Sequence, residues 1–165
     1  MPPLLSYAPE ALLAKQWLQA YAYGPVFVPP LILSGTLCNV LLAYSSPTTS
    51  MKLLYGLAAA FTWIIMPFTL LYMEPGVNGA GKWKVERLLV DEDGDKRYMM
   101  KENEGWLPRV DRHTATGEAR AWAEGVRMRD IVERWVVVNR WRFWVTALAM
   151  GVSAVATCNW GGLLW

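Results

Sequence analysis

Uncharged stretches divide the chain into apolar segments and one charged segment. No Asp, Glu, Lys or Arg occurs from Gln16 to Met51, from Leu53 to Met73, or from Phe143 to Trp165. A helix needs about 20 apolar residues to cross the hydrocarbon core of a bilayer, and each stretch can supply them. The pattern predicts an all-α integral membrane helical bundle, one membrane domain over residues 1–165, with three transmembrane spans near 24–44, 53–73 and 143–162.

Prolines modify two of these spans. Pro25, Pro29 and Pro30 stand near the start of the first span, so its helix is expected to begin near Pro30 or to kink there. Pro67 would free the carbonyl of Trp63 and bend the second span.

The segment between the second and third spans carries most of the charge. Alternation of apolar and polar residues from Trp83 to Met100 predicts a β-hairpin. The acidic run from Asp91 to Asp95 invites a calcium-site interpretation, but Gly94 is its fourth residue, whereas an EF-hand loop needs glycine sixth. A solvated turn is the favoured interpretation. From Glu118 the pattern predicts a helix that continues into the third span.

Composition agrees with a membrane protein and excludes several other classes. Hydrophobic residues make up 54% of the chain, which is too much for an ordinary soluble domain of this size. The alternative is a small soluble bundle, in which three helices apolar on all faces are rare. A net charge of +2 gives no basic excess for nucleic acid. Two cysteines and one histidine cannot form a zinc site or a disulfide framework.

Basic residues near the span ends predict the orientation. Residues 74–142 hold 14 of the 16 Lys and Arg, while the turn between the first two spans has only Lys52. Because basic loops stay in the cytoplasm, we expect residues 75–140 to form a cytoplasmic insert, with a cytoplasmic N-terminus and a lumenal C-terminus. The expected location is the endoplasmic reticulum.

One helical face changes from apolar to polar where the third span meets the membrane. Met128, Val132, Trp135, Asn139 and Arg142 follow one another at spacings of four, three, four and three. An arginine in a bilayer costs up to about 3 kcal/mol, so Arg142 either reaches the interface or faces a wet cavity between helices. Arg134 and Arg140 lie mostly on other faces and are interpreted as interfacial anchors.

Three segments together resemble a known family. They are Trp135-x-x-x-Asn139-x-x-Arg142, the stretch Trp17-x-x-x-Tyr21-x-x-Gly24 followed by Pro29-Pro30-Leu31, and Ile65 to Glu74-Pro75-x-x-Asn78. Their order and placement resemble the anthrone oxygenase-like small membrane proteins of fungal polyketide pathways. That family usually has four spans, and nothing here corresponds to the first. A histidine often follows the glycine matched by Gly24, where this chain has Pro25.

The resemblance implies a cofactor-free oxygenase that converts an anthrone to an anthraquinone in secondary metabolism, with O2 as co-substrate and no metal. The implied catalytic residues are Asn139 and Arg142, which would stabilise an enolate or peroxide anion. Trp135 would stack on a flat hydrophobic aromatic substrate, and Tyr21, Thr69 and Asn78 would give polar lining. No base is identified, because the lone histidine, His113, is expected in a solvated loop.

Two other functions stay open. One is a non-enzymatic membrane scaffold or subunit that recruits partners through its insert. The other is a related membrane cyclase or isomerase of a hydrophobic metabolite. Besides membrane lipid, a homo-oligomer or a pathway partner is expected, because three spans leave an incomplete bundle compared with four.

Overall fold

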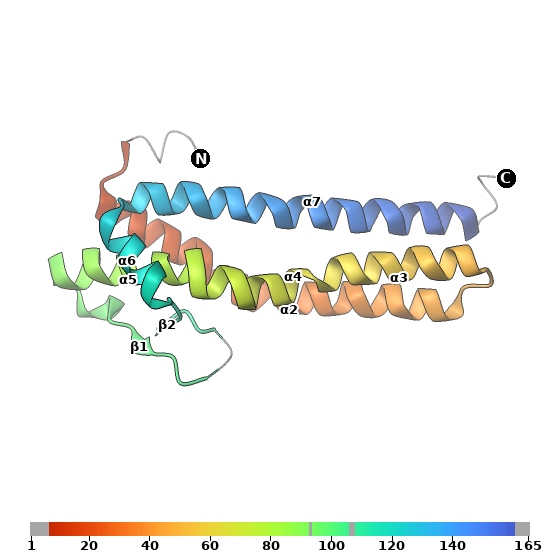
Figure 1. Ribbon diagram of the computed structural model, residues 1–165, viewed down its shortest axis with the longest axis horizontal. Helices are drawn as coiled ribbons and strands as arrows, with labels where there is room; N and C mark the ends of the chain where they lie inside the picture. The colour runs from red at the N-terminus through yellow and green to blue at the C-terminus, as the bar shows by residue number, and fades with distance from the viewer. Residues whose placement is uncertain (1–6, 93, 106–107, 161–165) are drawn as a thin grey trace. The chain divides into compact units, whose positions relative to one another are not determined.

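The fold is almost entirely helical, and the computed structural model describes residues 7–92, 94–105 and 108–160 (Figure 1). In this part of the chain, three helices are long and apolar enough to cross a membrane: Glu10–Ser45, Thr49–Glu92 and Met128–Cys158. The predicted all-α class with three apolar helices is confirmed. The predicted span boundaries stay a prediction, and residues 161 and 162 of the third span lie outside the described residues. The elements, in order, are α2 (Glu10–Ser45), α3 (Thr49–Trp63), α4 (Ile65–Phe68), η1 (Thr69–Asn78), α5 (Gly79–Glu86), η2 (Arg87–Glu92), η3 (Lys96–Tyr98), β1 (Lys101–Glu102), β2 (Arg112–His113), α6 (Gly117–Gly125) and α7 (Met128–Trp160).

The first helix begins much earlier than its prolines predicted. Helix α2 starts at Glu10 and runs without interruption through Pro25, Pro29 and Pro30, so a start near Pro30 is wrong. Its first turns bury an apolar face that includes Leu13 and Trp17. Burial of this face stabilises the part of α2 that precedes the prolines. The charge pattern alone did not predict a helix in that part of the chain.

The described chain forms two compact units, each with its own contacts. One unit combines the described residues up to Phe27 with those from Phe68 to Val138, and the other combines Val28–Pro67 with the described residues from Asn139 onward. In the second unit, polar side chains join apolar helices: Ser153 donates to Asn39 at 3.0 Å, and Tyr55 and Thr157 share a hydrogen bond of 3.0 Å. The candidate site lies in the first unit.

The second apolar helix changes its winding near two prolines. Helix α3 ends at Trp63, four residues before Pro67. Proline has no N–H to donate to the Trp63 carbonyl, so the α-helical hydrogen bond between these two residues cannot form. A π-helical segment, η1, then spans Thr69–Asn78 and is bent at Gly76, whose φ of −96° and ψ of −111° are not helical.

The predicted β-hairpin from Trp83 to Met100 is wrong. Residues 79–92 are helical instead, in α5 and η2, and the short η3 follows. Val85, Leu88 and Leu89 are buried together in one core cluster. They stand at positions i, i+3 and i+4, which lie on one side of a helix, so the pattern fits a helix as well as a strand. The observed strands are β1 and β2, which pair in parallel over two residues each.

The acidic run begins at the end of η2 and continues into a turn, and two of its carboxylates, Asp91 and Asp95, pair with arginines. Gly94 takes a positive φ of 72°, and Asp93 lies outside the described residues. Asp91 pairs with Arg87 at 2.7 Å. Hydrogen bonds from Arg97 lower the pKa of the Asp95 carboxyl to about 2. These contacts agree with a solvated turn.

The helix predicted from Glu118 into the third span is interrupted. Helix α6 ends at Gly125, and Val126 is extended, with φ −122° and ψ 162°. A new helix, α7, begins at Met128 and continues to Trp160. Two carboxylates stabilise the interruption: Asp130 accepts from the Arg127 backbone N–H at 3.1 Å, and Glu10 accepts from the Met128 N–H at 2.6 Å.

Candidate functional site

A buried polar cluster surrounds Glu74, which lies in the π-helical segment η1. The Glu74 side chain is almost fully buried, with a residue exposure of 4%. Tyr21 reaches it from α2 and donates its hydroxyl to Glu74 Oε1 at 2.8 Å. Asn78, one turn further along the chain, donates its amide to the same oxygen at 2.7 Å. Two of the predicted binding residues therefore meet at a carboxylate.

The second oxygen of the same carboxylate has two further donors. Lys82, whose side chain has no exposed surface, forms an ion pair with Glu74 Oε2 at 3.2 Å. Its ammonium also lies 3.3 Å from the Arg109 carbonyl and 3.5 Å from the Tyr21 hydroxyl. Thr114 donates its hydroxyl to Glu74 Oε2 at 3.2 Å. The buried lysine charge is thus paired, as burial requires.

This arrangement directs most of the Glu74 acceptor positions at protein donors. A carboxylate has about four acceptor positions; Tyr21, Asn78 and Lys82 donate to it, and Thr114 shares its single hydroxyl hydrogen between Oε2 and the Glu74 carbonyl. A proton acceptor in catalysis needs a lone pair directed at the substrate. Glu74 therefore has the character of a structural anchor and not of a base.

The same contacts hold the backbone where η1 bends. Thr114 also donates to the Glu74 carbonyl at 2.9 Å, and the Thr116 N–H donates to the Pro75 carbonyl at 3.0 Å. Gly79 lies so close to Ala115 that a Cβ there would be 2.5 Å from the Ala115 backbone nitrogen. The chain between β2 and α6 is therefore packed tightly against the bend.

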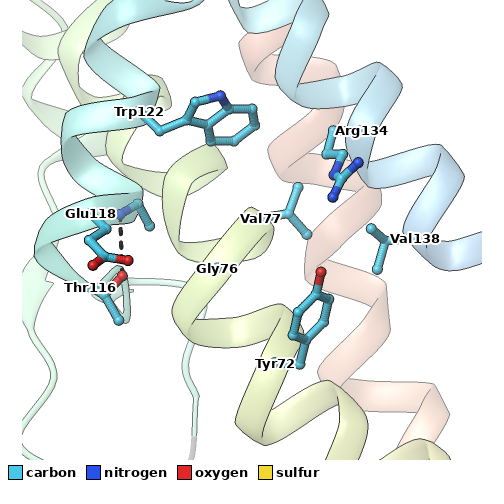
Figure 2. Close-up of a pocket in the computed structure, with 9 residues that line it drawn as sticks. Tyr72, Gly76, Val77, Thr116, Glu118, Trp122, Arg134 and Val138 are labelled. Atoms are coloured by element: carbon cyan, nitrogen blue, oxygen red, sulfur yellow. Dashed lines mark hydrogen bonds between the residues drawn. The ribbon is translucent and has the colours of Figure 1, made fainter.

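A pocket of about 470 Å³ opens beside this bend, between η1, α6 and α7 (Figure 2). The volume lies in the range of small-molecule sites. Figure 2 shows Trp122 and Arg134 extending into it from α6 and α7, and Tyr72 from η1. Its lining combines aromatic, apolar and charged side chains: Tyr72, Gly76, Val77, Thr116, Glu118, Ala119, Trp122, Arg134 and Val138.

The two charged groups of the pocket, Arg134 and Glu118, are available for chemistry. Neither forms an ion pair with any residue that the structure describes, and both are exposed. A guanidinium can stabilise an anion, and a carboxylate with free lone pairs can accept a proton. Trp122 and Tyr72 add flat aromatic surface. The pocket can therefore hold a planar aromatic molecule and support an anionic form of it.

The remaining predicted site residues lie in several places. Trp135 packs edge-on against Trp17, with ring centroids 6.3 Å apart. Thr69 is the first residue of η1 and is half-buried. Asn139 and Arg142 belong to the second unit, where Arg142 donates to the Asn139 side-chain oxygen at 3.2 Å. The catalytic role of this pair stays a prediction.

His113 does not lie in a solvated loop, as the sequence predicted. It belongs to β2, is 5% exposed, and bonds through Nε2 to the Glu86 carboxylate. Its ring lies 5.1 Å from that of Trp83. Strand pairing and these contacts bury a side chain whose charged sequence neighbours indicated exposure.

Sequence reasoning missed the anchor at Glu74 and the charged groups of the pocket. The spacing of four between Glu74, Asn78 and Lys82 is a signal that could have revealed the anchor, because it places a carboxylate, an amide and an ammonium on one helical face. Arg134 was interpreted as an interfacial anchor, whereas the structure places it in the pocket. No signal in α7 alone distinguishes the two roles.

The described chain thus has three helices long and apolar enough to cross a membrane and a pocket lined by aromatic and charged side chains. The family model for anthrone oxygenase matches residues 17–152, a range that includes both the Glu74 cluster and the pocket. The chain therefore belongs to the anthrone oxygenase family, which supports an oxygenase role. Comparisons with curated proteins and with solved structures returned no match.

Proposed function

We propose that this protein is an oxygenase that oxidises the central methylene of an anthrone to the carbonyl of an anthraquinone, without a cofactor. The observation that carries the proposal is the pocket, which combines aromatic walls with a guanidinium and a carboxylate that form no ion pair with any described residue. Family membership supplies the reaction class. The polyketide pathway context belongs to the same proposal.

The first step in this scheme is the loss of a proton from the methylene. Glu118 accepts the proton, and the electron pair of the broken C–H bond passes into the rings to give an enolate. Arg134 stabilises the negative charge on the enolate oxygen. Because this charge develops only as the proton is lost, the interaction lowers the barrier to deprotonation. Trp122 and Tyr72 orient the flat rings.

The electron-rich enolate then reduces O2. A C–O bond forms at the methylene carbon, and the resulting peroxide takes up a proton. Loss of the second methylene hydrogen as a proton, with cleavage of the O–O bond, gives the carbonyl and hydroxide, which is protonated to water. The balance is one anthrone and one O2 to one anthraquinone and one water.

The test compares three arginine variants of α7. Arg134→Gln should slow the oxidation of emodin anthrone by about tenfold to a hundredfold, somewhat less than the loss of a fully buried oxyanion donor. Arg140→Gln is the matched control, because Arg140 is an exposed residue of the same helix. The sequence-based alternative gives the role to Arg142, with Asn139 beside it, and Arg142→Leu measures that alternative.

Rates are measured with purified protein in air and under nitrogen, and the spontaneous oxidation is subtracted. If Arg134→Gln equals wild type while Arg142→Leu loses activity, the site lies at Arg142 and the pocket assignment is wrong. If wild type does not exceed the spontaneous rate, the oxygenase proposal itself is contradicted, and a scaffold or another substrate is favoured.

A further inference from the structure

The Glu74 cluster is an unusual feature because it places a charge pair in a part of the protein that the proposed chemistry does not use. Glu74, Lys82 and Tyr21 each expose 5% or less of their surface. A buried ion pair contributes little to stability compared with an apolar core of the same shape. Another role for the cluster follows from where its hydrogen bonds go.

The cluster fixes both ends of the bend in η1. The Glu74 side chain joins the bend to α2 through Tyr21 and to α5 through Lys82. Thr114 holds the side chain and the backbone carbonyl of Glu74 with the same hydroxyl. Gly76 and Val77, immediately after Glu74 and Pro75, form part of the pocket wall. The anchor and the wall are therefore parts of one short segment.

The opposite wall depends on the same contacts. Thr116, two residues after Thr114, lines the pocket and donates its backbone N–H to Pro75. Thr116 also caps α6, because its hydroxyl accepts from the Ala119 N–H at 3.2 Å. Glu118 and Trp122 follow in that helix. A displacement of the bend would move both walls.

We propose that Glu74 is a positioning residue, whose four side-chain hydrogen bonds hold the Pro75–Gly76 bend and thereby set the shape of the substrate pocket. The inference rests on the proposed function, since the pocket is its substrate site. Loosening the bend impairs substrate binding more than the chemical step, because the bend and the start of α6 form the walls that enclose the substrate, whereas Arg134 lies on α7 and takes part in none of the hydrogen bonds that the structure describes at the bend.

The experiment removes single hydroxyl groups from the cluster and leaves its ion pair in place. Tyr21→Phe deletes one donor to Glu74, and Thr114→Val deletes the donor shared by its carboxylate and carbonyl. Tyr55→Phe is the matched control, because it deletes the hydroxyl of another buried tyrosine, which pairs with Thr157 in the second unit. These isosteric changes preserve packing better than removal of Glu74 would.

Two quantities are measured in detergent-solubilised full-length protein. Hydrogen exchange of peptides covering residues 69–79 and 114–122 reports on the bend and on the opposite wall without any substrate. In both cluster variants, exchange of these peptides should accelerate by about tenfold, which corresponds to a decrease of about 1.4 kcal/mol in the free energy of local opening. KM for emodin anthrone should rise by about tenfold while kcat stays within about threefold. Tyr55→Phe should change neither quantity.

The proposal is overturned if exchange in these peptides matches that of Tyr55→Phe. It is also overturned if exchange accelerates while KM stays at the wild-type value, or if kcat falls and KM does not change. A wild-type protein without anthrone oxidation would contradict the proposed function separately. The exchange measurement would then decide alone whether the cluster holds the two walls.

Discussion

Gly79 is a residue whose importance comes from space and not from its backbone angles. Its φ of −61° is ordinary for a helix, so any residue could adopt it. An added Cβ, however, would lie 2.5 Å from Ala115 backbone atoms and 2.7 Å from the Glu74 carbonyl. Backbone atoms cannot move aside as a flexible side chain can. A side chain at this position must therefore separate the Thr114–Thr116 segment from the bend.

We expect Gly79→Ala to destabilise the protein by about 1–3 kcal/mol, the usual cost of overpacking. Gly56→Ala is the control, because nothing lies within 4 Å of a Cβ at Gly56, in the middle of α3. There the change should be neutral or stabilising by up to about 1 kcal/mol. Thermal unfolding in detergent measures both, and a Gly79→Ala protein as stable as wild type would show that the two segments can separate without cost.

At the scale of single residues, the sequence predicted some members of the candidate site but not their partners. Tyr21 and Asn78 were expected to line a substrate site, and the structure brings both to Glu74. Their shared acceptor lies 53 residues from Tyr21 along the chain, a separation over which periodicity says nothing. Arg134 was interpreted as an interfacial anchor, because the periodicity of a single helix cannot show which residues face a neighbouring helix.

Among the elements, the long apolar helices were predictable and the charged insert was not. An uncharged stretch of about 20 residues has few structures available in a bilayer, which makes the helix prediction strong. The stretch from Lys84 to Val90 fits a strand and a helix almost equally well. Burial of Val85 and Leu89 in the same core decides for the helix, and that burial depends on contacts with α2.

Helix α6 has nine residues, so its first turn depends strongly on its cap. Thr116→Ala removes the acceptor for the Ala119 N–H and should lower the free energy of unfolding by about 1 kcal/mol. Thr116→Ser keeps the hydroxyl and should stay close to wild type. Chemical denaturation in detergent compares the two, and equal stability of the serine and alanine variants would exclude a capping role.

For the whole molecule, the separation of charged and apolar segments predicts an orientation in the membrane. We expect the insert at residues 75–140 to lie in the cytoplasm, because the segment between the spans holds most of the basic residues. A glycosylation sequon engineered beside Gly94 should stay unmodified in microsomes. A sequon tag appended after Trp165 should be glycosylated and serves as the positive control. Glycan on the Gly94 sequon would reverse the topology.

The order in which the chain is synthesised determines when each compact unit can close. Both units join an early part of the described chain to a late one: residues up to 27 with residues 68–138, and residues 28–67 with residues from 139 onward. Glu10, which caps the start of α7 at Met128, leaves the ribosome 118 residues before its partner. At about 5–20 residues per second, that interval is about 6–24 s. During this time α2 has been synthesised, but the Glu10 carboxylate in its first turn still lacks the Met128 N–H. A chain truncated within the insert would never form this contact, and we expect quality-control proteases to recognise its incomplete first unit.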